Sequence, residues 1–147
     1  MADFLNLAKI KIKKNLFEKI IKLVLGAEKK QGEISVVLVN SQEIKKINKK
    51  YRGKNEITDV ISFSNKDVKN NFVLHPKEKQ LGEIFLCPEK LKKSAKESET
   101  DFDSEFARSF IHGILHLLGY DHKNKKELLK MEKKEKKYFQ IVTNKGN

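Results

Sequence analysis

The amino-acid sequence predicts an α+β fold, in which about five helices are layered on a mixed sheet of about four strands. Two observations support this class. Segment 33–40, EISVVLVN, is β-branched and nearly continuously apolar, as expected of a strand covered on both faces. Segment 14–27 instead carries apolar residues at helical spacing, and segments of these two kinds follow one another along the chain.

Local signals place the elements in the order strand, helix, strand, helix, two strands and three helices. Asn40 and Asn124 each precede a glutamate by three residues and resemble the start of a capping box. Pro88 suits the first turn of a helix that follows a strand. The predicted strands span 8–13, 33–40, 59–63 and 81–87, and the predicted helices span 14–27, 40–51, 89–97, 102–118 and 124–141.

The length of the chain favours one hydrophobic core. With 147 residues we expect a single domain over 1–147, with a flexible tail from about residue 142. The start of the chain shows no signal peptide, and no apolar stretch approaches the roughly 20 residues that cross a bilayer. Cys87, the only cysteine, excludes an internal disulfide and fits a reducing compartment. We therefore expect a cytoplasmic protein with no membrane association.

Three of the four histidines lie in one stretch, SFIHGILHLLGYDH, at 109–122. His112 and His116 are four residues apart, so on a helix they lie about 40° apart around the axis and one turn along it. Gly119 suits the left-handed residue that ends a helix, and the chain can then turn back to bring His122 towards the other two. Three imidazoles with a fourth position left to water are typical of a catalytic zinc site.

Two alternatives apply to this motif. An isolated histidine among apolar helix residues is usually a hydrogen-bonded core residue, but three at metal spacing make unpaired burial costly. The frame His-x3-His-x2-Gly-x2-His is also that of metzincin peptidases, in which a catalytic glutamate follows the first histidine. That position is Gly113 here, so a peptidase would lack its general base.

The charge of the chain favours polyanionic partners. The formal net charge is +12, and lysines of segment 123–147 supply much of it, although such lysines are often only a solvated face. Of the 32 basic residues only Arg52 and Arg108 are arginines. Both are therefore candidates for positions that need a planar, bidentate group.

The residues 112–122, HGILHLLGYDH, resemble the signature HGxLHLxGYDH of the YbeY family, bacterial rRNA maturation factors described as metal-dependent endoribonucleases. All nine fixed positions match. The segment 51–64, YRGKNEITDVISFS, resembles a second signature of the family. LGEIFLCPE at 81–89 resembles a third, with Glu83 in place of the more usual aspartate. The resemblance covers roughly residues 33–131.

The resemblance implies a single-strand-specific endoribonuclease that acts on the 3′ end of small-subunit rRNA and in late ribosome maturation. It implies that His112, His116 and His122 bind zinc and that Arg52 is the active-site arginine, which could hold a phosphate in two hydrogen bonds. Asp121, next to the last histidine, is a candidate partner of a ligand or proton shuttle, or simply a turn residue. The expected partners are rRNA precursor and the small subunit, with a GTPase or ribosomal protein suggested by the family alone.

Some properties stay open at this stage. Three imidazoles also suit nickel, cobalt or iron, so the residues do not identify the physiological metal. The general base, the cut site and the oligomeric state are not encoded in any motif of this chain. Besides the peptidase, a non-catalytic ribosome-assembly factor with a structural metal remains an alternative to the endoribonuclease.

Overall fold

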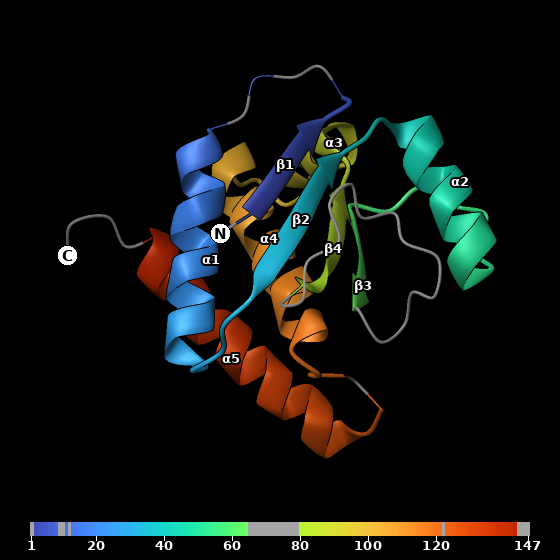
Figure 1. Ribbon diagram of the computed structural model, residues 1–147. Helices are drawn as coiled ribbons and strands as arrows, with labels where there is room; N and C mark the ends of the chain where they lie inside the picture. The colour runs from blue at the N-terminus through green and yellow to red at the C-terminus, as the bar shows by residue number, and fades with distance from the viewer. Residues whose placement is uncertain (1, 9–10, 12, 65–79, 122, 144–147) are drawn as a thin grey trace.

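A four-stranded mixed sheet forms the centre of the molecule (Figure 1). The computed structural model describes residues 2–8, 11, 13–64, 80–121 and 123–143. The strands are β1 (Ala2–Asn6), β2 (Glu33–Leu38), β3 (Val60–Ser64) and β4 (Gln80–Leu86). Their order is β1-β2-β4-β3, with β1, β2 and β4 parallel and β3 antiparallel to β4. The predicted α+β class and the mixed sheet are confirmed.

Five helices surround this sheet in the predicted order. They are α1 (Lys14–Ala27), α2 (Ser41–Arg52), α3 (Pro88–Glu97), α4 (Phe102–Leu117) and α5 (Lys125–Thr143). The caps agree with the sequence signals, since Asn40 and Asn124 each accept a hydrogen bond from the backbone N–H of the glutamate three residues on. No helix among the described residues is both long and apolar enough to cross a membrane.

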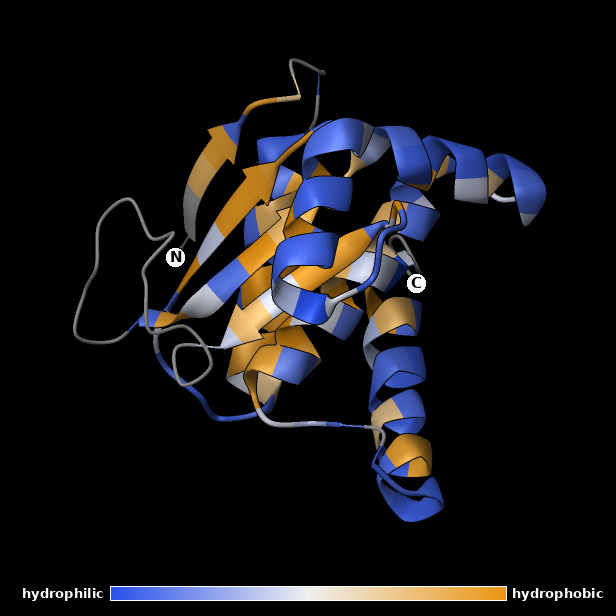
Figure 2. Ribbon diagram, turned by 90° about the vertical axis from the view of Figure 1, so that its right-hand side faces the viewer, coloured by the Kyte–Doolittle hydropathy of each residue, from blue (hydrophilic) through white to orange (hydrophobic). Residues whose placement is uncertain are grey.

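Alternate residues of the strands contribute side chains to two hydrophobic clusters, one on each face of the sheet. On one face Val36 and Ile84 join the larger cluster with residues of α1, α3, α4 and α5. On the other face Ile61 and Phe85 join Ile44 of α2. Figure 2 shows hydrophobic residues along the strands and the helix that packs on them, and hydrophilic residues over much of the outer helices. The sheet is therefore covered on both sides, as segment 33–40 predicted.

One predicted strand is in the wrong place. The edge strand expected at 8–13 lies earlier, at Ala2–Asn6, where it pairs with β2. Of the expected strand, the described residues Ala8, Lys11 and Lys13 belong to no strand, whereas every residue of β1 has a partner in β2. The polar segment 65–79 with His75 lies outside the described residues.

Helix α4 lies against the sheet at close range, and this contact positions the site. A Cβ atom at Gly113 would lie 3.3 Å from methyl groups of both Ile84 and Val60. Ten of the sixteen residues of α4 are buried. Phe106 and Phe110 contact Phe17 of α1 edge to face, at ring-centroid distances of 4.5 and 5.2 Å. The helix is thus fixed between sheet and α1, and its remaining face borders a cleft.

Candidate active site

A cleft of about 1310 Å³ lies between α4 and the segment that links α2 to β3. One wall is a face of α4, to which residues three or four apart contribute: Glu105, Ser109, His112 and His116. Arg52 and residues 58–62 also line the cleft. The cleft therefore brings together two signatures that are about 60 residues apart in the sequence.

The first two histidines of the motif point their rings at each other. Nε2 of His112 and Nε2 of His116 are 3.1 Å apart, and the ring centroids are 4.6 Å apart. Two imidazole nitrogens that bind one tetrahedral zinc ion at 2.0–2.1 Å would be about 3.3 Å apart. The helix thus places both nitrogens at the separation of two ligands of one ion.

Glu135 of α5 orients the first of these rings. Its Oε2 atom lies 2.9 Å from Nδ1 of His112, and both side chains are partly buried. A proton held on Nδ1 by this contact leaves Nε2 with a lone pair that faces His116. Metal-binding histidines usually have a carboxylate or carbonyl at the second nitrogen, and Glu135 is in that position.

The end of α4 has the turn that the glycine predicted. Gly119 has φ +102°, its N–H donates to the carbonyl of His116, and the N–H of Tyr120 donates to the carbonyl of Leu115. These two bonds are those of a Schellman motif, which reverses the chain after a helix. The turn brings Asp121 back to line the cleft.

A cluster around Glu28 fixes this turn against the rest of the fold. The carboxylate of Glu28, at the end of α1, accepts hydrogen bonds from Tyr120 at 2.6 Å and from Tyr138, and pairs with Lys134 at 3.2 Å. Burial acts to raise the pKa of Glu28, but the bonds from both tyrosines and Lys134 outweigh it and hold that pKa below its ordinary value. Burial and the bond to Glu28 raise the pKa of Tyr120 to about 12.

The third predicted ligand, His122, lies outside the described residues. Within the described part of the chain, no three His, Cys, Asp or Glu side chains form a group that could hold a metal ion. The metal roles of His112, His116 and His122 therefore stay predictions. Asp121 is described and partly buried in the cleft wall, and its role also stays a prediction.

Arg52 also lines the cleft, and its phosphate-binding role stays a prediction. Its Nη2 atom donates to the carbonyl of Ser62 at 2.6 Å, and its guanidinium lies over the Phe63 ring at 5.3 Å. These contacts hold the exposed Arg52 side chain in place in the lining of the cleft. The sequence alone left open whether Arg52 faces the histidines, and both line the same cleft.

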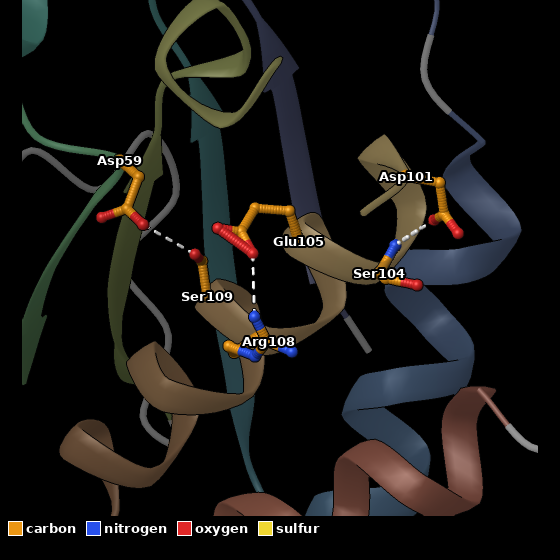
Figure 3. A network of polar contacts seen from close by, with 6 residues as sticks. All are labelled: Asp59, Asp101, Ser104, Glu105, Arg108 and Ser109. Carbon is orange, nitrogen blue, oxygen red and sulfur yellow. Dashed lines mark hydrogen bonds and ion pairs between the residues drawn. The ribbon is translucent and has the colours of Figure 1, made fainter. Parts of the chain in front are cut away.

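A polar network extends along α4 beyond the histidines (Figure 3). Asp59 accepts a hydrogen bond from the Ser109 hydroxyl at 2.8 Å, which ties the start of β3 to the helix. One turn earlier, Nη1 of Arg108 donates to Glu105 at 3.0 Å. Asp59 also lines the cleft, so this bond joins its two sides.

Sequence reasoning missed Glu135 and Glu105. Glu135 belongs to a helix rich in charged residues, where a glutamate usually faces solvent. Glu105 lies in the first turn of α4, where an acidic residue is already favoured by the helix dipole. A signal was present for Glu135, because Met131 and Tyr138 mark the inward side of α5 and position 135 lies one turn from each. Nothing in the local sequence indicates which residue of another helix it meets.

Gly113 faces the sheet. Because Ile84 and Val60 occupy the space beyond its Cα, a larger side chain there meets the core before it can reach the cleft. The glutamate that metzincin peptidases carry after the first histidine is therefore absent for a packing reason as well as in sequence.

A cleft that joins histidines, carboxylates and a positioned arginine on a rigid α+β scaffold is typical of a hydrolase active site. Comparison with known proteins gives this class a family. The model of the family described as Endoribonuclease YbeY matches residues 5–143, and the chain belongs to the YbeY endoribonuclease family.

Individual relatives agree with the family match. An Endoribonuclease YbeY from Buchnera aphidicola subsp. Schizaphis graminum is 43% identical over 125 residues, which cover 85% of this chain and 76% of the relative. One from Mesomycoplasma hyopneumoniae (strain 7448) is 40% identical over 137 residues, covering 90% and 89% of the two chains. The solution structure of TM1509 from Thermotoga maritima superimposes with a TM-score of 0.66 at 30% identity, covering 98% of this chain and 90% of that one.

Proposed function

We propose that this protein is a single-strand-specific, metal-dependent endoribonuclease that processes the 3′ end of small-subunit rRNA in late ribosome maturation. His112, His116 and His122 would hold one zinc ion in the cleft. The observation that carries the proposal is the 3.1 Å separation of the His112 and His116 Nε2 atoms, with Glu135 at the far nitrogen of His112. The family match supports the reaction class.

The charge of the cleft supports a cation among its components. Of the described residues that line it, four are basic and five are acidic, so the walls alone do not attract a phosphate strand. A divalent cation would reverse this sign at the point where the histidines meet. When bound with an open position, zinc supplies a water of lowered pKa or polarises a phosphoryl oxygen.

Each protein group then has a defined task. Arg52 binds the phosphate opposite the histidines in two hydrogen bonds and stabilises charge that grows on its oxygens. Glu135 keeps the proton of His112 on Nδ1. Asp121, beside the third histidine, accepts or relays a proton at the same side of the cleft.

The setting of the reaction follows from the same proposal. The substrate is rRNA precursor, presented on the small subunit in the cytoplasm, with the lysine-rich surface contributing salt-dependent attraction to the RNA backbone. A ribosome-associated GTPase or a ribosomal protein is the candidate partner that delivers it. Imidazole also suits nickel, cobalt and iron, so elemental analysis of the native protein identifies the metal used in the cell.

One experiment separates this function from its alternatives. The purified protein is incubated with structured rRNA precursor and with casein, each with and without a chelator, beside a His116→Ala variant. We expect RNA cleavage that is lost in both the chelated and the mutant samples. Casein cleavage would support a peptidase instead, and RNA binding without any turnover would support a non-catalytic assembly factor.

A further inference from the structure

We propose that Arg108 forms a second phosphate subsite, which binds the phosphate next to the one that is cleaved. The inference rests on the proposed ribonuclease function and adds a specificity-determining residue to it. Arg108 lies in the wall of the cleft, four residues before His112 on the same face of α4. The two positions are therefore about 6 Å apart along the helix axis. This is comparable to one nucleotide step of an extended strand.

The guanidinium of Arg108 is already oriented. Nη1 donates to Glu105 Oε1 at 3.0 Å, and the guanidinium carbon lies 4.8 Å from the centroid of the Phe139 ring (the Glu105 contact is in Figure 3). Glu105 is the only hydrogen-bond acceptor that Arg108 contacts among the described residues. A guanidinium has five N–H donors, so one edge holds Glu105 and another can receive a phosphate.

Exposure distinguishes the two members of this pair. The Arg108 side chain is 50% exposed, whereas that of Glu105 is 10% exposed. The carboxylate is thus largely covered, while the guanidinium of Arg108, which also lines the cleft, remains half accessible to solvent. An ion pair that served stability alone would gain little with one partner half in solvent.

The choice of arginine supports a binding role. The chain has 32 basic residues and uses lysine for all but two, and both arginines line the cleft. A lysine would serve equally for an i,i+3 pair with Glu105 on a helix surface. Arginine adds a planar fork that binds phosphate in two hydrogen bonds, and this is the property that Arg52 and Arg108 share.

The test neutralises one phosphate at a time. Oligoribonucleotides with a single methylphosphonate at successive positions around the cleaved linkage are compared for cleavage by metal-loaded wild type, Arg108→Gln and Arg108→Lys. For wild type, one position adjacent to the cleaved linkage should raise KM about tenfold with little change in kcat. Arg108→Gln should lose that sensitivity at that position alone, and Arg108→Lys should keep only part of it.

Two controls complete the design. Lys92→Gln on α3, an exposed charge outside the cleft, should behave as wild type at every position. Thermal unfolding of Arg108→Gln detects any loss of folding. Equal sensitivity of wild type and Arg108→Gln at all adjacent positions would overturn the subsite while leaving the nuclease function intact. Absence of RNA cleavage by the metal-loaded wild type would overturn both.

Discussion

Glu135 offers the sharpest test of the proposed metal centre, because its role can be measured without any RNA. The change is Glu135→Gln, which keeps the size of the side chain and a carbonyl oxygen but removes the charge. In the structure the carboxylate lies 2.9 Å from Nδ1 of His112, with side chains 21% and 30% exposed. Loss of such an outer contact typically costs 10–100-fold in metal affinity, or about 1.4–2.7 kcal/mol.

The partial exposure of this pair favours the lower part of that range. We expect Glu135→Gln to weaken zinc binding about tenfold, and Glu135→Ala, which removes the acceptor as well, to approach a hundredfold. The assay is competition for zinc against a chromophoric chelator at neutral pH. Glu132→Gln is the matched control, because it removes the same charge from an exposed position of the same helix. An unchanged zinc affinity in Glu135→Gln would refute the reasoning.

Three further predictions concern other parts of the molecule. Arg52→Lys should lose most RNA cleavage and retain zinc, because lysine cannot form the bidentate contact; full cleavage would contradict the role. Gly113→Ala should destabilise the fold by about 1–3 kcal/mol in urea unfolding, since its Cβ lies 3.3 Å from two branched side chains. Gly26→Ala, with open space around it in α1, should stabilise by about 0.5–1 kcal/mol, and equal effects would contradict the packing argument. Because the pKa of Glu28 in the folded state is below 4.5, ionised Glu28 should stabilise the fold above pH 4.5, and this stabilisation should be lost as the pH falls through the folded-state pKa. In Glu28→Gln, the free energy of unfolding, measured in urea at a series of pH values, should fall less steeply towards acid pH.

The fold was largely predictable because its signals are local. The periodicity of segment 14–27, the caps at Asn40 and Asn124 and the proline at 88 each act within a few residues, and the helices begin where they indicate. The edge strand was predicted at the wrong residues because alternation is a local pattern, while strand pairing depends on a partner distant in sequence.

In the candidate site, too, the features set by local sequence were predictable and those set by packing between elements were not. The spacing of His112 and His116 and the glycine at 119 are properties of one helix and its end, so the sequence could predict their geometry. Glu135 reaches His112 from α5, and Asp59 reaches Ser109 from the start of β3. Those contacts depend on how elements pack together, and no local pattern specifies the residue that a side chain will meet.

Helix α4 both packs in the core and lines the cleft, and this constrains how the enzyme could change during evolution. One side of the helix contains Phe106, Phe110 and Ile114 in the core, and the other side lines the cleft. Substitutions that shift the helix would disturb folding and catalysis together, so few substitutions in α4 should be tolerated. The part of the cleft around Arg52 is less constrained by packing, because Arg52 is exposed and contacts β3, an edge strand of the sheet. New preferences for RNA sequence or shape should therefore arise first by variation around α2 and β3, with the histidine wall inherited unchanged.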